Sequence, residues 1–165
     1  MGGQLDIRGR WEGSYDYDLE KLRPPGGSGV KFDLSVSQNS FERVFGKFKG
    51  IVDEVSMGGN RVESRVKGVC QFPAVRFIKD TAMFYVFAKG SRMPFREYLL
   101  SLGCEPKHDS LQMPIFYEGN FSDATQASGT WTRKGHRISV PSQDHGGANI
   151  IVRFAEATGT WTIRR

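Results

Sequence analysis

Polar and apolar residues alternate along most of the chain with a period of two, which is typical of half-buried β-strands. The clearest case is 30–37, which reads VKFDLSVS. A fully regular alternation of this kind points every second side chain to the same face of a sheet. The same pattern predicts strands over 9–17, 44–55, 61–72, 74–79, 115–121, 127–133, 137–140, 149–154 and 158–163, and leaves 82–88 as either a strand or a buried turn.

Between these segments the sequence predicts one short helix and several turns. Apolar residues fall at helical spacing only over 94–102, and Gly103 follows as a capping residue. The Pro- and Gly-rich stretch 22–29 is predicted to be a long loop, and 82–113 a second one. The residues at 56–60 suit a hairpin turn, because Gly and Asn accept positive φ angles.

Nine or ten short strands without regularly intervening helices predict an all-β protein. We expect residues 1–165 to form a single domain, since 165 residues are the length of one ordinary domain. The predicted architecture is an antiparallel up-and-down barrel of about eight strands, because closure buries the apolar face and removes unpaired edges. A two-sheet β-sandwich is the alternative, since both architectures show the same alternation.

Each of the three tryptophans follows a glycine by two positions, at Gly9-Arg10-Trp11, Gly129-Thr130-Trp131 and Gly159-Thr160-Trp161. Residues two apart share a strand face, so each indole lies beside a position without a side chain. This arrangement would let neighbouring strands interlock as the barrel closes. We interpret the indoles first as core residues, with the lining of a ligand pocket as the alternative.

The N-terminal Gly9-Arg10-Trp11, which enters an antiparallel meander, resembles the calycin superfamily. That superfamily includes lipocalins, fatty-acid-binding proteins and avidins, which are small-ligand barrels. The strands that carry Trp131 and Trp161 are similar to the repeated Trp-containing strands of avidins. The resemblance implies an interior ligand site, and a late basic residue, Arg164 or Arg165, set against Trp11 at the barrel end.

The main functional prediction is therefore the binding of a small apolar or aromatic ligand inside the barrel. An eight-stranded barrel has an interior that is either filled by side chains or large enough for one small ligand. Tyrosine hydroxyls and one arginine would supply the few polar contacts that such pockets use. The predicted cavity wall consists of Trp11, Tyr15, Tyr17, Phe32, Phe48, Arg76, Tyr117, Phe121, Trp131 and Trp161.

The net charge of +5 adds an alternative function, because it favours contact with polyanions. Five basic residues on two adjacent predicted strands would form a stripe on the outer wall, beside Phe45 as a stacking residue. The alternative is therefore a protein-interaction or nucleic-acid-binding module that uses the barrel surface and loops, without catalysis. A homodimer is a further expectation by analogy, and Asp53 and Glu54 are expected at the surface. The basic stripe comprises Lys47, Lys49, Arg61, Arg65 and Lys67.

Other reactive residues do not form a recognisable site. The spacing of Cys70 and Cys104 fits neither a zinc site nor a redox pair, so a reduced, cytoplasmic protein is expected, with disulfide pairing left open. The group around His108 and Asp109 is interpreted as a polar loop, and no catalytic residue, metal or cofactor is predicted. No apolar run approaches the roughly 20 residues of a membrane-spanning helix, and no export signal begins the chain, so no membrane partner is expected.

Overall fold

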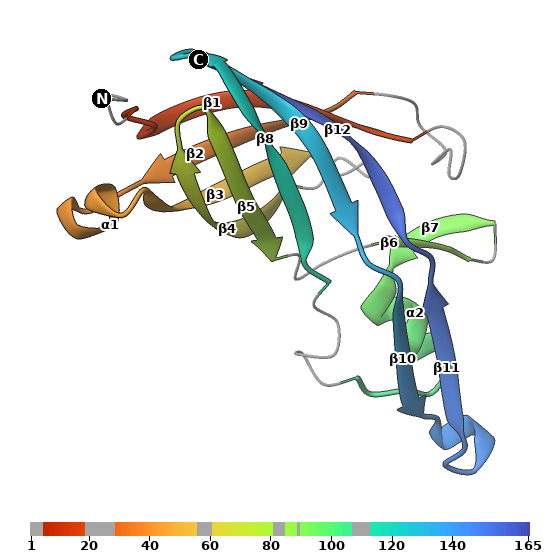
Figure 1. The fold of residues 1–165 in the computed structure, drawn as a ribbon. Helices are drawn as coiled ribbons and strands as arrows, with labels where there is room; N and C mark the ends of the chain where they lie inside the picture. The colour runs from red at the N-terminus through yellow and green to blue at the C-terminus, as the bar shows by residue number, and fades with distance from the viewer. Residues whose placement is uncertain (1–4, 19–28, 56–60, 81–84, 89, 107–112) are drawn as a thin grey trace. The chain divides into compact units, whose positions relative to one another are not determined.

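The computed structural model describes residues 5–18, 29–55, 61–80, 85–88, 90–106 and 113–165. Eight antiparallel strands close into a barrel, as Figure 1 shows. The barrel strands are β1 (Gly9–Tyr17), β2 (Val30–Ser37), β3 (Lys47–Val55), β4 (Arg61–Gln71), β5 (Ala74–Asp80), β8 (Ile115–Asp123), β9 (Gln126–Arg133) and β12 (Ala157–Arg164). Around the wall they follow the order β1, β12, β9, β8, β5, β4, β3, β2, and β2 pairs with β1 to close the sheet. The predicted barrel is confirmed, and closure of the sheet excludes the two-sheet sandwich.

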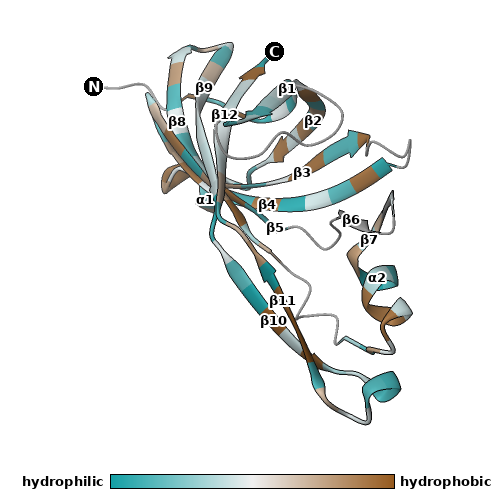
Figure 2. Cartoon of the chain, turned by 90° about the vertical axis from the view of Figure 1, so that its right-hand side faces the viewer, coloured by the Kyte–Doolittle hydropathy of each residue, from teal (hydrophilic) through white to brown (hydrophobic). Residues whose placement is uncertain are grey.

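The period-two alternation of the sequence separates the interior of the barrel from its outer wall. Along β4 and β5 every second residue is buried, with only one interruption, at Gly68, which is half-buried. Figure 2 shows the same alternation as hydrophilic and hydrophobic bands along β3 and β4. The inward side chains form one continuous core of aromatic and aliphatic residues. Burial of this face accounts for most of the stabilisation that closes the barrel.

The two ends of the barrel differ in the length of their connections. β1, β3, β5 and β9 all finish at one end, where the chain continues through 18–29, 56–60, 81–114 and 134–156. We call this the long-connection end. At the opposite, short-connection end the turns at 72–73 and 124–125 are tight, and 38–46 joins β2 to β3. The apolar ring of Trp11 lies near this short-connection end, where it contacts Phe121 at a centroid distance of 5.6 Å.

The last two tryptophans interlock with glycines of the neighbouring strand. In the register of β9 and β12, Trp131 lies opposite Gly159 and Trp161 lies opposite Gly129. A Cβ atom at Gly159 would approach Asp16 O to 1.8 Å and Trp131 Nε1 to 2.5 Å, so no larger residue fits there. Both indoles are buried and donate hydrogen bonds to backbone oxygens, which identifies them as core residues. The predicted interlocking is confirmed.

Two insertions form a second compact unit, Thr81–Met113 with Lys134–Glu156. The first contains the hairpin of β6 (Tyr85–Ala88) and β7 (Ser91–Pro94), followed by α2 (Phe95–Ser101). The second contains the hairpin of β10 (His136–Pro141) and β11 (Asn149–Phe154). Buried Phe95 and Leu99 of α2 pack with Cys104, Ile138 and Val140. The unit therefore has a small hydrophobic core of its own.

Some local predictions need correction. The strand predicted over 44–55 begins only at Lys47, because α1 (Ser40–Val44) precedes it and Gly46, with φ of 66°, turns the chain into β3. The helix predicted over 94–102 is confirmed as α2. The segment 82–113, predicted as a long loop, contains β6, β7 and α2. The predictions for 22–28 and 56–60 lie outside the described residues.

Cys70 and Cys104 are both buried free thiols. Burial raises the pKa of the Cys70 thiol to about 11, so this residue is a thiol and not a thiolate near neutral pH.

Candidate functional site

Nine of the ten residues predicted for the cavity wall lie on the inward face of the barrel. Seven are buried, and Tyr15 and Tyr17 are half-buried against the same core. Arg76 is the exception, because its neighbours Val75 and Phe77 point inward and the alternation of β5 turns Arg76 outward. Its side chain is 80% exposed and pairs with Glu118 on the outer wall at 4.0 Å. The prediction that Arg76 supplies a polar contact inside the barrel was wrong.

The inward aromatic rings contact one another across the middle of the barrel. Phe77 stacks on Tyr117 with ring centroids 4.5 Å apart, and its edge meets Trp161 at 5.4 Å. Near the long-connection end, the ring centroid of Trp131 lies 5.0 Å from that of Tyr17 and 6.1 Å from that of Tyr15. Aromatic side chains therefore occupy the middle of the barrel and reach Trp131 near the long-connection end, so a ligand would have to lie beside the half-buried Tyr15 and Tyr17.

A buried ion pair lies inside the barrel at the long-connection end. Lys79, the second-last residue of β5, points inward, and its Nζ lies 3.1 Å from Glu54 Oε1. Glu54 is the second-last residue of β3 and shares the inward face of Phe48 and Val52. The two side chains are only 3% and 12% exposed. Transfer of both charges from water into this apolar interior is costly, and the mutual attraction of the pair roughly balances that cost.

Hydrogen-bonding capacity around this pair is only partly used. Glu54 Oε2 and Ser64 Oγ are both buried, and neither has a hydrogen-bond partner among the described residues. Lys79 Nζ also lies 5.3 Å from the centroid of the Tyr15 ring. Because β1 and β5 lie on opposite sides of the eight-stranded barrel, this contact spans the interior. We call Glu54, Ser64, Lys79 and Tyr15 the polar cluster.

Tyr15 of the cluster and the nearby Tyr117 are held in their neutral form. Burial raises the pKa of the Tyr15 hydroxyl far above its ordinary value, and the neighbouring Glu54 carboxylate raises it further. Burial and Glu54 raise the pKa of Tyr117 in the same direction. Neutral hydroxyls both donate and accept hydrogen bonds. The cluster therefore offers an ammonium group, a carboxylate and neutral hydroxyls within one apolar wall.

The sequence contains a signal for this cluster, although neither Lys79 nor Glu54 was predicted to line the interior. In 74–80 the alternation places Lys79 on the face of Val75 and Phe77, so a lysine stands on an otherwise apolar face. The same alternation separates Asp53, which pairs with Arg61 on the outer wall, from Glu54, which points inward. The expectation that Glu54 lies at the surface was therefore wrong. The alternation of inward and outward positions along a strand, applied to charged residues as well, would have predicted that both Lys79 and Glu54 point inward.

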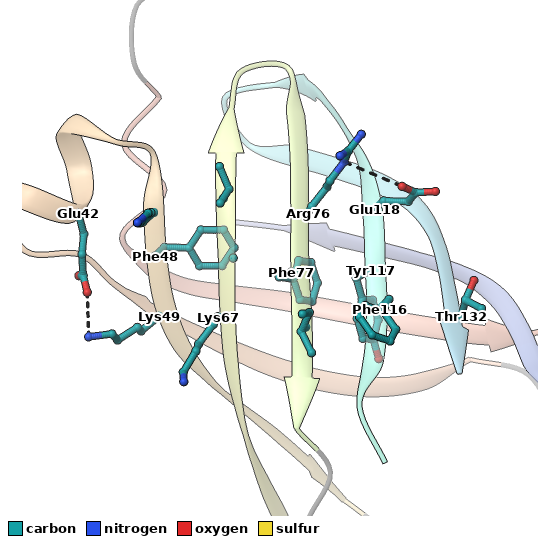
Figure 3. A pocket seen from close by; sticks show the side chains of 14 residues that line it. Glu42, Phe48, Lys49, Lys67, Arg76, Phe77, Phe116, Tyr117, Glu118 and Thr132 are labelled. Carbon is teal, nitrogen blue, oxygen red and sulfur yellow. Dashed lines mark ion pairs between the residues drawn. The ribbon is translucent and has the colours of Figure 1, made fainter. Parts of the chain in front are cut away.

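A concave surface lies on the outer wall of the barrel, across β3, β4, β5 and β8 (Figure 3). Its volume is about 600 Å³. Strand register places Lys49, Lys67, Ile78 and Phe116 side by side in one row across these strands. The next row contains Lys47, Val69, Arg76 and Glu118. We call this surface the outer groove.

The predicted basic stripe is partly reproduced on this wall. Lys47, Lys49 and Lys67 line the outer groove, and Arg65 is exposed on β4 beside it. Arg61 is engaged with Asp53, and Phe45 lies directly after α1 and not in a strand. Within the described part of the chain, no group of three or more His, Cys, Asp or Glu side chains could hold a metal ion. His108 and Asp109 lie outside the described residues.

The predicted contact between a late basic residue and the first tryptophan is present. The guanidinium carbon of Arg165 lies 4.6 Å from the centroid of the Trp11 ring, at the short-connection end. Arg164 instead points outward and approaches Glu12 at 3.8 Å. Arg165 is therefore the residue that occupies the position implied by the calycin resemblance.

Comparison with known proteins identifies the fold and no family. No protein-family model matches the chain, and no curated protein matches it. Among solved structures, a redesigned beta barrel is similar, with a TM-score of 0.51 and 11% sequence identity over 96% of this chain and 90% of that chain. At this identity the likeness concerns the barrel fold alone. Among the described residues, neither α-helix has the length and apolar character needed to cross a membrane.

Proposed function

We propose that the barrel binds one small, mostly apolar molecule at the long-connection end, with a polar group of that molecule on the polar cluster. The observation that carries the proposal is the buried pair of Lys79 and Glu54, whose surroundings retain unused hydrogen-bonding capacity. Buried polar atoms are almost always satisfied in folded proteins, so unpartnered atoms beside a buried charge need an explanation. A ligand that carries a hydrogen-bonding group would satisfy them.

The position of the cluster supports a site that opens toward the barrel end. Tyr15, Tyr17 and Ile115 are half-buried there, whereas Phe77 and Trp161 in the middle of the barrel are 3% and 1% exposed. Ligand pockets usually combine an apolar wall with a few fixed polar groups. The aromatic wall supplies the first feature and the polar cluster the second. The bound molecule would be apolar or aromatic, with a donor for Glu54 Oε2 or an acceptor for Lys79.

The relationship to calycins is part of the same proposal. The contact of Arg165 with Trp11 and the up-and-down topology of the eight strands support it. The Arg165 side chain covers the Trp11 ring at the short-connection end, so the proposed ligand site is at the opposite end, beside the polar cluster.

The test uses anilinonaphthalene sulfonate, a fluorescent aromatic probe with one anionic group. The double variant Lys79→Met with Glu54→Leu removes both interior charges, and Ile78→Ser changes the adjacent, outward-facing residue of the outer groove. We expect saturable binding by the wild type, at least about tenfold weaker binding by the double variant, and unchanged binding by Ile78→Ser. Unchanged binding by the double variant, together with weaker binding by Ile78→Ser, would place the probe in the outer groove and refute the interior site.

A further inference from the structure

The short helix α1 and its C-cap residue Phe45 present three large apolar side chains to solvent. Phe41 is 68% exposed, Val44 is 72% exposed and Phe45, which ends the helix, is 53% exposed. No residue of α1 is buried, so none of its apolar side chains contributes to the core. Phe41 and Phe45 lie against each other, with ring centroids 4.8 Å apart. We call Phe41, Val44 and Phe45 the apolar tip.

The exposure of the apolar tip is built into the structure of α1. Asn39 Oδ1 accepts a hydrogen bond from Glu42 N at 2.7 Å, and Glu42 Oε2 accepts one from Asn39 N at 2.9 Å. This reciprocal capping box fixes the first turn of the helix. Glu42 also pairs with Lys49 of β3 at 2.9 Å, which ties the helix to the barrel. A five-residue helix would otherwise be marginal in water, so these contacts hold the tip in an outward position.

Basic residues adjoin the apolar tip. Arg43 lies in the last turn of α1, and Lys47 begins β3 two residues after Phe45. Lys67 lies opposite Lys49 in the neighbouring strand. In the described residues, Lys47 and Lys67 have no acidic side chain within ion-pair distance, so their charge is available to an anionic partner.

We propose that the apolar tip and these adjoining cations dock the barrel on a membrane surface that contains anionic lipids. In Figure 1, α1 projects from the barrel between β2 and β3, so the tip is a convex protrusion. Aromatic and aliphatic side chains flanked by lysine and arginine are typical of segments that lie in the lipid headgroup region. Cations near such a surface are attracted by its negative potential. The sequence predicted no membrane partner because no apolar run approaches the length of a spanning helix, and surface docking does not require one.

The composition of the tip distinguishes a lipid surface from a nucleic acid. In a nucleic acid, the bases stack on aromatic rings and the phosphates pair with cations, but neither group binds to an aliphatic side chain. Val44 is the most exposed large apolar side chain of the tip, and the outer groove beside it adds Val69 and Ile78. The acyl chains of a lipid bilayer make apolar contacts with aromatic and aliphatic side chains alike. The tip also lies at the short-connection end, away from the polar cluster, so docking and ligand binding are independent.

The test is flotation of the full chain with vesicles of phosphatidylcholine, either pure or with about one third phosphatidylserine. We expect the wild type to float with the anionic vesicles and not with the neutral ones, and to be released by salt because the attraction is screened. The triple variant Phe41→Ser, Val44→Ser and Phe45→Ser should bind at least about tenfold more weakly. Val55→Ser is the matched control, since Val55 is 58% exposed at the opposite end of β3.

Two further arms keep the proposal falsifiable. The pair Lys47→Gln with Lys67→Gln leaves the tip intact and should weaken binding to anionic vesicles alone. If the wild type does not float with anionic vesicles, or if the triple variant floats as the wild type does, the proposal is wrong. Binding of a single-stranded oligonucleotide that requires the same lysines, without vesicle binding, would overturn it in favour of nucleic acid. Far-UV circular dichroism of each variant checks that the barrel is retained.

Discussion

At the level of single residues, the interior of the barrel contains a conflict between burial and charge. Lys79 and Glu54 satisfy each other through a 3.1 Å contact, but an apolar pair of similar volume would fill the same space without loss of hydration. A buried ion pair is therefore weak evidence for stability. Its presence beside the unpartnered Ser64 Oγ is the observation on which the proposed ligand site rests.

This reasoning predicts the stability of three variants. Lys79→Met alone leaves the Glu54 carboxylate buried and unpaired, and should lower the free energy of unfolding by about 3–5 kcal/mol. Glu54→Leu alone leaves the ammonium group in the same position and should have a similar effect. The double variant should be close to the wild type or more stable. Urea unfolding followed by tryptophan fluorescence measures all three. A double variant as unstable as the sum of the single variants would show that the two residues do not interact, and would contradict the buried pair.

Single residues also show what the sequence could specify about the site. Strand parity correctly predicted that Trp11, Tyr117 and Trp161 face inward, because each occupies an alternating apolar position. The same alternation, applied to charged residues, predicts that Lys79 also faces inward. Sequence alone could not reveal that Lys79 meets Glu54, because these residues lie on strands β5 and β3, and the intervening β4 fixes their separation only after folding.

At the level of helices and strands, the strands were predicted well and short helices less well. Alternation repeated over seven to eleven residues predicts a strand clearly, as in β2 and β4. The five residues of α1 provide little more than one helical turn, and Val44 continues the alternation of β3. The capping box of Asn39 and Glu42 was the only local signal for α1. The second unit was missed because its hairpins and helix pack through residues far apart in the chain.

The core of the second unit gives a prediction about its helix. Leu99 of α2 is fully buried, whereas its neighbour Leu100 is 46% exposed. Leu99→Ala should destabilise the unit by about 2–5 kcal/mol, because the deletion leaves a cavity, and Leu100→Ala should have little effect. Hydrogen exchange should accelerate over 95–101 and 136–154 in Leu99→Ala while β3, β4 and β5 retain their protection. Equal acceleration in the barrel strands would show that the two units unfold together.

Across the barrel as a whole, different chemistry lies at the two ends. The short-connection end holds Trp11 against Arg165 and carries the apolar tip of α1. The long-connection end holds the polar cluster, and the half-buried Tyr17 lies at the same end. Closure of eight strands leaves no free edge in the barrel sheet for β-augmentation. The two proposed binding modes therefore use the interior and the protruding helix.

Binding inside the barrel is tested most directly by native mass spectrometry of the protein purified from its own host, compared with its mass after denaturation. We predict an additional small-molecule mass on the native wild type, and its absence from the Lys79→Met, Glu54→Leu double variant purified in the same way. The Ile78→Ser variant, changed only on the outer wall, should retain that mass. A bound molecule that persists in the double variant would contradict the assignment of the polar cluster as its anchor.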